Sequence, residues 1–366
     1  MKKRIVEILT NGFKPDVRVY KEAVYMIQNG YDVTILCWDR EPEDELPSEE
    51  VIDGIRVVRF RIISAAGRNS SVRKLHSYYR FALECKKYIK KNHFDYIHCN
   101  DNSGALVGLY ANKSNIPMIV DMHEFFEQGG MIKKNFLRQI NLLYLRKSVA
   151  GIYENPAYLG EPYKDVRDRL IPLRNYPDSS MVKHLPKEKS NVFRIGFHGW
   201  VRPRMIEFEA LFEAVNGMDD VRVDINGGGP GVPIITELAK KYSNVHINGS
   251  FDGTKELTSL YQKTDLVFCG YDPDDPNYQG EAEIVKFYEA IVTGTPMLMT
   301  ESIGMGEKVR KNSWGLTCDT RSANEIRQAV IKLKDDKTFW QECSDNELES
   351  APLYSWENAV KRLDEI

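Results

Sequence analysis

Short apolar runs alternate with amphipathic segments along the chain, and this alternation predicts an α/β fold. Residues 4–10 form an apolar run that ends at the turn-forming pair Asn11-Gly12, and residues 31–38 form a second apolar run. Between them, residues 17–27 carry apolar side chains at helical spacing. Strand, turn, helix and strand in this order open a Rossmann-like unit.

The same alternation starts again in the second half of the chain. Residues 193–200 and 221–231 read as strands that run into turns, and a helix is predicted between them over 206–215. Further strands are expected at 55–62, 94–101, 117–127, 244–251 and 314–319, and a further helix at 323–333. The pattern therefore predicts two Rossmann-like units with parallel sheets.

A chain of 366 residues is longer than one ordinary hydrophobic core and suits two domains. Asn175, which is flanked by prolines, is the predicted junction between them. The predicted domains are residues 1–175 and 176–354.

The composition is that of a soluble globular protein, with 42% hydrophobic and 28% charged residues. No apolar run approaches the roughly 18 residues that span a bilayer. Glu7 interrupts the apolar run behind the basic N-terminus, so this segment is expected to be a first strand and not a signal peptide. The six cysteines show neither C-x-x-C nor metal-ligand spacing, which predicts buried thiols in the cytoplasm.

Charge is shared unevenly between the two halves. Residues 1–175 hold 28 Lys and Arg against 22 Asp and Glu, a net charge of +6, whereas the remainder holds 22 against 31, a net charge of −9. This division argues against a nucleic-acid binder built on the whole chain. It is compatible with a first domain that contacts an anionic surface or an anionic substrate.

One stretch, residues 280–299, sorts its side chains into two groups. Apolar side chains follow helical spacing from Ile284 to Val292, and Gly294 stands where a helix ends. Lys286 and Glu289 fall on the opposite side of this predicted helix. A solvated helix face that carries charges is one interpretation, and an anion site near the helix start is the other.

The second interpretation gains from a resemblance. Glu281 and Glu289 have seven residues between them, and the pair resembles the paired-glutamate signature of retaining GT-B glycosyltransferases of family 4. The resemblance implies that Glu281 lies near the donor sugar, that Glu289 holds the nucleotide ribose, and that Lys286 belongs to a K-x-x-E variant common in polysaccharide-assembly enzymes. The usual E-x-F-G opening is absent, because Ala282 and Glu283 replace it.

The first domain carries further motifs that are similar to this family. In the run DVRVYKEA, Asp16 and Arg18 would face the acceptor; the alternative is that the charge of Asp16 complements the helix dipole and Arg18 is solvated. In the D-x-H-E segment at a strand end, the resemblance implies that His123 faces the sugar, whereas a lone histidine is otherwise a structural residue. Gly12, in the first strand–helix turn, joins the donor-binding set. No G-x-G-x-x-G follows the first strand, which weakens a nicotinamide-cofactor reading.

In the second domain the resemblance implies a donor pocket built from loops. Arg202 and Arg204 lie between a strand and a helix, where a diphosphate suits both guanidinium groups and backbone amides; the family's K-G pair is missing here, and two exposed arginines are the alternative. Gly227 and Gly229 match the family's G-x-G-P turn, and Phe251 stands where relatives contact the nucleobase.

Two basic segments and two acidic segments complete the sequence-based picture. Residues 68–91 and 131–147 mix basic with aromatic and apolar side chains, which indicates either contact with anionic lipid or a surface helix with one buried face. Residues 40–50 are expected to be an acidic loop. Asp272, with Asp274 and Asp275 close by, is assigned to a loop that flanks the cleft and not to a metal site.

The sequence is therefore identified as a GT-B, family 4-type retaining glycosyltransferase, with its two Rossmann-like domains facing across a cleft and the helix 355–366 packing back toward the first domain. The resemblance implies a nucleotide-sugar donor, with UDP-sugar preferred, and a glycan or lipid-linked acceptor in polysaccharide assembly. It implies neither a cofactor nor a catalytic metal, and places the enzyme in the cytoplasm or on the inner face of the membrane. A catalytically silent GT-B-like binding subunit and a sugar-nucleotide epimerase, with His123 and Glu281 as its ionisable groups, remain alternatives.

Overall fold

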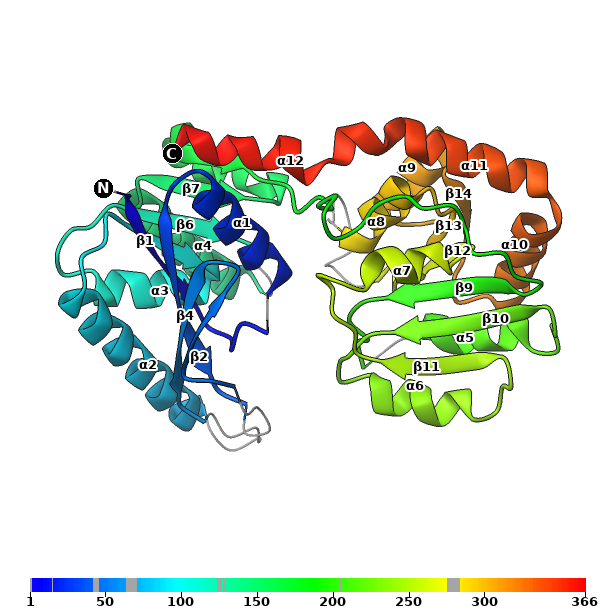
Figure 1. Cartoon of the computed structure of the whole chain (residues 1–366), viewed down its shortest axis with the longest axis horizontal. Helices are drawn as coiled ribbons and strands as arrows, with labels where there is room; N and C mark the ends of the chain where they lie inside the picture. Colours follow the sequence, from blue (N-terminus) through cyan, green and yellow to red (C-terminus); the bar gives the residue numbers. More distant parts are fainter. Residues whose placement is uncertain are drawn as a thin grey trace. The chain divides into compact units, whose positions relative to one another are not determined.

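The computed structural model divides the chain into two compact units (Figure 1). Unit 1 contains residues 1–174 with 360–366, and unit 2 contains residues 175–359. The structure describes residues 2–14, 16–41, 46–63, 71–123, 127, 130–203, 206–274 and 284–366, together with the backbone but not the side chains of 71–73.

Unit 1 is built on an eight-stranded sheet with the strand order β3-β4-β2-β1-β5-β6-β7-β8. All neighbouring strands are parallel except β3, which pairs antiparallel with β4. The strands are β1 (Arg4–Leu9), β2 (Asp32–Asp39), β3 (Glu49–Ile52), β4 (Ile55–Arg61), β5 (Tyr96–Asn100), β6 (Met118–Met122), β7 (Ala150–Tyr153) and β8 (Leu170–Pro172).

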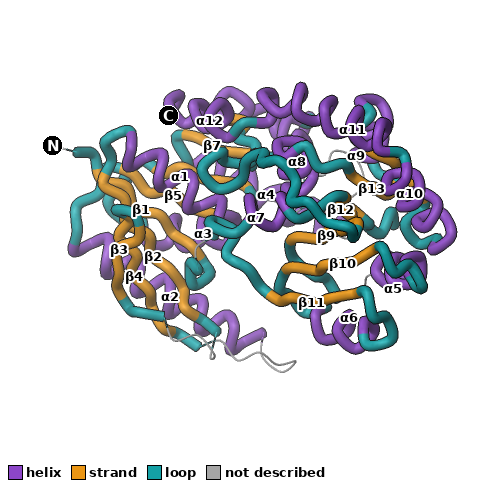
Figure 2. The backbone as a smooth tube through the Cα atoms, turned by 45° about the vertical axis from the view of Figure 1, so that its right-hand side comes forward, coloured by secondary structure: helices purple, strands orange, loops and turns teal. Residues whose placement is uncertain are grey.

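Helices cover both faces of this sheet (Figure 2). The α1 face buries one core, which includes Val19, Ala23 and Ile35, and the face under α2, α3 and α4 buries a second core around Phe81 and Leu145. The helical segments are α1 (Val17–Gln28), α2 (Ser71–Lys91), α3 (Asp101–Ala111), α4 (Met131–Lys147) and the 3-10 helices η1 (Pro156–Leu159), η2 (Glu161–Arg169) and η4 (Val360–Glu365).

The expectation of an acidic loop over residues 40–50 is wrong at its end. Glu49–Ile52 forms β3, in register with Ile55–Val58 of β4. The tight connection explains the difference, because Asp53 and Gly54 both take a positive φ between the two strands and close a hairpin. Residues 42–45 lie outside the described residues.

Unit 2 is built on a six-stranded, entirely parallel sheet with the order β11-β10-β9-β12-β13-β14. Its strands are β9 (Phe193–His198), β10 (Val221–Asn226), β11 (Val245–Gly249), β12 (Leu266–Cys269), β13 (Met297–Thr300) and β14 (Gly315–Cys318). Its helices are α5 (Ile206–Val215), α6 (Val232–Ala239), α7 (Leu257–Gln262), α8 (Val285–Thr293), α9 (Gly304–Asn312), α10 (Ala323–Asp335), α11 (Lys337–Ser350), η3 (Ala351–Tyr354) and α12 (Trp356–Ala359).

Both sheets are doubly wound: successive strands are added toward one edge of the sheet first and toward the other edge afterwards. The reversal lies between β1 and β5 in unit 1 and between β9 and β12 in unit 2. In such sheets, ligands bind beyond the carboxyl ends of the strands at this reversal. A ligand site is therefore expected among the polar residues that follow β1, β5, β6, β9 and β10.

Two sequence-based expectations can be compared directly with the described residues. All six cysteines are buried and free, which confirms the predicted buried thiols. Within the parts of the chain that are described, no helix has the length and hydropathy of a membrane span.

Candidate functional site

Helix α8 carries the two central donor-site candidates of unit 2. It starts one residue later than predicted, and Gly294 ends it with φ 59° and ψ 45°, the left-handed conformation expected of a C-terminal glycine. Lys286 and Glu289 are both 8% exposed, so the interpretation of a solvated, charged face is wrong. Phe197 of β9 and Tyr261 of α7 contact Lys286 and Glu289, and α11 and η3 also pack against the helix.

The ammonium group of Lys286 lies over an aromatic ring inside the unit. Its Nζ atom is 3.1 Å from the centre of the Phe197 ring and 5.5 Å from that of Tyr271. Burial lowers the pKa of Lys286 to about 7, against the opposing effects of Cys269 and Glu289. Near neutral pH this lysine can therefore take up a proton when an anion binds beside it.

Glu289 is held by a buried tyrosine. The hydroxyl of Tyr261 donates a hydrogen bond of 2.8 Å to Oε2 of Glu289. Tyr261 itself is fully buried, and burial together with the Glu289 carboxylate raises the pKa of its hydroxyl well above the ordinary value. Tyr261 thus stays a hydrogen-bond donor and fixes the carboxylate on the helix.

A neutral histidine lies against the same tyrosine. The rings of His198 and Tyr261 are 4.9 Å apart, and burial lowers the pKa of His198 to about 3. Nδ1 of His198 accepts from the Asn226 amide at 3.1 Å, so its Nε2 donates to the Thr264 hydroxyl at 3.0 Å. Sequence reasoning missed His198 and Asn226, although both are the last residues of their strands.

Two of the predicted donor-site glycines allow loops to pack closely. A side chain on Gly227 would collide with the carbonyl oxygen of Gly199, and one on Gly229 would collide with that of Val201. Gly229 also has a φ of 129°, a positive value that favours glycine over residues with a side chain. Gly227 has a φ of 157°, which lies close to extended backbone. The two loops join through a bond from the Val201 amide to the Gly228 carbonyl at 2.8 Å.

The remaining donor-site candidates fall into two groups. Arg202 lies close enough to Lys286 to lower the pKa of that lysine, and the Phe251 ring is 6.5 Å from the ring of His198. Arg204 and Glu281 lie outside the described residues. The structure thus brings Lys286, Glu289 and Arg202 into one region of unit 2.

In unit 1, the turn after β1 is fixed by contacts that the sequence did not reveal. Asp16 caps α1, because its carboxylate accepts from the Val19 amide at 3.5 Å and from the Asn11 side chain at 3.0 Å. Buried Arg59 donates to the Gly12 carbonyl at 2.7 Å. Arg59 was missed because it belongs to an apparently ordinary alternating strand. The acceptor role of Asp16 and the donor role of Gly12 stay predictions.

Arg18 and His123 meet at one carboxylate. Arg18 donates to both oxygens of Asp121, at 3.1 and 3.0 Å, and Nε2 of His123 lies 3.1 Å from Asp121 Oδ2. Burial opposes charge on His123, but Asp121 outweighs it and raises the pKa of the imidazole to about 9. Burial would raise the pKa of Asp121, yet Arg18 and His123 hold it far below its usual range. The expectation that Arg18 is solvated is wrong, since it is 5% exposed.

More ionisable groups lie buried behind this carboxylate, and sequence reasoning missed them. Burial raises the pKa of Glu7 to about 8 and that of Glu22 well above its ordinary value. Burial lowers the pKa of His98 to about 4. Glu22, His98 and Asp121 form the one trio of potential metal ligands found among the described residues. Arg18 already pairs with both carboxylates of this trio, at 3.0 and 3.1 Å, which disfavours a cation there.

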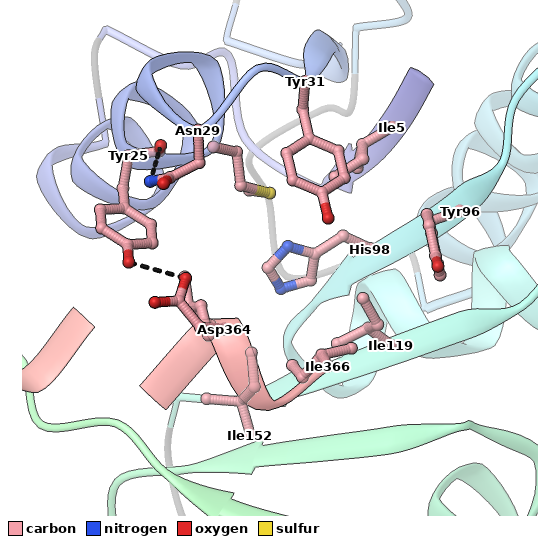
Figure 3. Close-up of a pocket in the computed structure, with 12 residues that line it drawn as sticks. Ile5, Tyr25, Asn29, Tyr31, Tyr96, His98, Ile119, Ile152, Asp364 and Ile366 are labelled. Atoms are coloured by element: carbon pink, nitrogen blue, oxygen red, sulfur yellow. Dashed lines mark hydrogen bonds between the residues drawn. The ribbon is translucent and has the colours of Figure 1, made fainter. Parts of the chain in front are cut away.

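A small cavity lies between the sheet of unit 1 and α1, and His98 is one of the residues that line it (Figure 3). It has a volume of about 80 Å³ and is lined mainly by apolar and tyrosine side chains. The last residues of the chain close one side, where Tyr25 donates a 2.8 Å hydrogen bond to Asp364. None of the predicted site residues lines this cavity.

Comparison with known proteins adds to this geometry. Residues 15–153 match the family model described as a glycosyl transferase 4-like domain. A sucrose-phosphate synthase of Zea mays is 38% identical over 68 residues, which are 19% of this chain and 6% of that protein. A probable sucrose-phosphate synthase of Craterostigma plantagineum is 35% identical over 191 residues, which are 49% of this chain and 17% of that protein. The matches thus span less than a fifth of these relatives.

Solved structures share the fold. Sucrose-phosphate synthase from Thermosynechococcus elongatus has a TM-score of 0.76 at 16% identity, with 100% of this chain and 98% of that chain covered. Anabaena HepE, solved in complex with UDP and glucose, has a TM-score of 0.67 at 14% identity, with 99% and 98% covered. A UDP-N-acetylglucosamine 2-epimerase has a TM-score of 0.64 at 13% identity, with 100% and 95% covered.

The two parallel sheets and these structural neighbours define a GT-B protein, which confirms the predicted α/β fold class. Within that class, residues 15–153 match the glycosyl transferase 4-like domain family. The predicted resemblance to GT-B, family 4-type glycosyltransferases is confirmed at this level, whereas the roles of the paired glutamates stay predictions.

Proposed function

We propose that the protein is a retaining glycosyltransferase that moves a sugar from a UDP-sugar to a glycan or lipid-linked oligosaccharide in polysaccharide biosynthesis. The observation that carries the proposal is the pair of buried, oppositely charged side chains on α8, Lys286 and Glu289, in a family 4-like GT-B protein. Such a pair suits a nucleotide diphosphate, because a cation attracts phosphate and a carboxylate accepts from ribose hydroxyls.

The donor is proposed to bind at the carboxyl edge of the unit 2 sheet. Lys286, Arg202 and Arg204 would hold the diphosphate, and Glu289 the ribose. Gly227 and Gly229 would let the backbone approach the donor, and Phe251 would lie near the base. UDP is the first candidate nucleotide because Anabaena HepE, which shares the fold, was solved with UDP and glucose.

Catalysis is proposed to need no metal and no protein base. The leaving diphosphate would take the acceptor proton while the cations of unit 2 stabilise its charge, an effect worth roughly 3–4 kcal/mol for one well-placed donor. His123 and Glu281 are assigned to the sugar, and Asp16 to the acceptor. Replacement of Lys286 by Ala is then expected to lower turnover about 100-fold or more.

The test is calorimetry with UDP, GDP, ADP and CMP on the wild type and on Glu289→Ala. Tight binding of one diphosphate that is lost in the variant would support the proposed seat on α8. Glu349→Ala, which changes an exposed carboxylate on α11, is the matched control and should bind as the wild type does. Absence of binding by every nucleotide would reject the transferase and favour a silent binding subunit.

A lipid-linked acceptor is supported by a surface in unit 1. The first six residues of α4 are all exposed, and Met131, Ile132 and Phe136 are exposed by 80%, 89% and 63%. Lys133 and Lys134 lie between them, and α4 contains no acidic residue. Exposed apolar side chains beside lysines suit a membrane surface with anionic lipids.

Vesicle flotation tests this membrane contact. Ile132→Ser with Phe136→Ser is expected to weaken association with vesicles of anionic lipid, and added salt should weaken association of the wild type. Val51→Ser, at an isolated side chain that is 70% exposed on β3, is the control. Equal flotation with neutral and anionic vesicles, or none with either, would remove the membrane from the proposal.

The epimerase keeps a specific observation in its favour, since a UDP-N-acetylglucosamine 2-epimerase shares the fold. The two reactions differ in their need for an acceptor. Incubation with UDP-sugars in the absence of any acceptor, followed by product analysis, separates them. Formation of an epimeric UDP-sugar would replace the transferase by the epimerase.

A further inference from the structure

The guanidinium of Arg18 is committed to partners inside unit 1. Its Nε and Nη2 atoms donate to the two oxygens of Asp121, and Nη1 donates to Glu154 at 3.3 Å. Nη2 also reaches the Leu173 carbonyl at 3.5 Å. With 5% of the residue exposed, the group sits behind the carboxylate and not at the surface. The acceptor contact expected of Arg18 from the sequence stays a prediction.

Glu22 is close to the same guanidinium but accepts no hydrogen bond from it. Its Oε1 atom is 3.1 Å from Nε of Arg18, but the hydrogen of Nε points to Asp121. Neither oxygen of Glu22 has a hydrogen-bond partner among the described residues. Burial and the Asp121 charge favour the neutral acid form of Glu22. The charge of Arg18 is then directed mainly to Asp121 and Glu154.

Asp121 joins this buried arginine to the strand-end histidine. Asp121 is completely buried, whereas the side chain of His123 is 18% exposed. The carboxylate contacts Arg18 with both oxygens and contacts Nε2 of His123 through Oδ2. This 3.1 Å contact is an ion pair and not an aligned hydrogen bond, because Nε2 of His123 has no hydrogen-bond partner among the described residues. Charge attraction draws Nε2 to the carboxylate, which leaves Nδ1 as the second polar atom of the ring.

We propose that Arg18 is a positioning residue: its two parallel hydrogen bonds fix the Asp121 carboxylate, which fixes the ring of His123 for contact with a sugar hydroxyl. The contact with sugar rests on the proposed function, but the fixing of the ring does not. A carboxylate that accepts hydrogen bonds at both oxygens cannot rotate about its terminal bond, whereas a carboxylate held at a single oxygen can rotate.

Lysine distinguishes geometry from charge at this position. Arg18→Lys keeps the positive charge but offers a single point donor, which cannot form the planar two-bond grip on a carboxylate. If the charge alone matters, the lysine variant will behave as the wild type. If the grip matters, the Asp121 carboxylate and the His123 ring will both lose their fixed orientation.

The direct readout is nuclear magnetic resonance of the protein labelled with nitrogen-15 in its histidines. His123→Gln identifies the His123 signals. In the wild type we expect a slowly exchanging proton on Nε2, because this atom is buried against the Asp121 carboxylate. We expect Arg18→Lys to broaden or lose this signal, and Glu22→Gln to keep it, because Gln imitates the neutral acid and leaves both bonds from Arg18 to Asp121 in place.

Steady-state kinetics measure the effect of Arg18→Lys on the proposed reaction. With the donor and acceptor of the proposed reaction, Arg18→Lys should lower kcat by roughly 10- to 100-fold while changing the acceptor KM little, since a misplaced group costs transition-state stabilisation. Thermal unfolding must show that the variant is folded. Asp121→Asn, which keeps the shape but not the charge, should lose the same proton signal.

The outcomes separate this inference from the proposed function. A retained Nε2 proton signal in folded Arg18→Lys overturns the positioning role. A raised acceptor KM together with that retained signal would assign Arg18 to the acceptor instead. Loss of the signal in a protein that transfers no sugar would keep the positioning role and reject the transferase.

Discussion

Protonation of Lys286 should make nucleotide binding depend on pH. In the free protein, burial lowers the pKa of this lysine to about 7. A diphosphate beside the ammonium group favours its charged form and raises the pKa again. Binding should therefore draw a proton from solution whenever the free protein holds Lys286 in its neutral form.

The magnitude follows from the shifted pKa. At pH 8 about nine in ten free molecules would hold Lys286 neutral, so binding should take up about 0.9 proton, against about 0.5 at pH 7. Above pH 7 the affinity should fall by nearly tenfold per pH unit, up to the pKa of the complex. The nucleotide contributes little to this, because a terminal phosphate with a pKa of about 6 is already ionised at pH 8.

Calorimetry in two buffers of different ionisation enthalpy measures this proton uptake directly. Lys286→Arg is the matched variant, because a guanidinium stays charged and should bind without taking up a proton. Equal proton uptake by the wild type and Lys286→Arg at pH 8 would refute the reasoning. So would an affinity for UDP that does not change between pH 7 and pH 9.

Three further outcomes are expected from the packing and the charges. Gly227→Ala should destabilise unit 2 by several kcal/mol, because the new side chain meets the carbonyl of Gly199. The control is Gly217→Ala, where φ is 71° and the space is open, and it should cost about 1 kcal/mol. Thermal unfolding compares the two variants. Arg59→Met should lower the free energy of unfolding by roughly 3 kcal/mol, since it removes a buried cation that pairs with a carboxylate and holds the β1–α1 turn, and urea titration will show whether it does. His123 should stabilise the fold most below pH 6.5 and lose this contribution, roughly 3 kcal/mol at most, as pH rises through about 9, so the stability of His123→Ala relative to the wild type should improve over that window.

Much of the architecture could be read from local sequence patterns. Runs such as residues 31–38 and 193–200 placed their strands to within two residues of β2 and β9. Gly294 marked the end of α8 because only a residue free to take positive φ ends a helix cheaply in that way. Such signals survive because period and turn chemistry act over a few neighbouring residues.

The same local reasoning missed what depends on burial. Glu7 looked like an interruption of an apolar strand, yet it is fully buried and bonded to Asn100, 93 residues away. For Lys286 and Glu289 a solvated face was one of two interpretations, because helical spacing shows which residues share a side but not what covers that side. Here the other layers of unit 2 cover both sides.

The sequence by itself determined the class of fold, the order of strands and helices, and the motifs that resemble family 4 enzymes. Only the tertiary structure decided that Arg18 grips Asp121, a partner 103 residues away, and that Asp121 contacts His123. The physical reason is that hydrogen-bond partners and desolvation arise between elements that folding brings together. No periodicity along the chain records which buried charge will face which other.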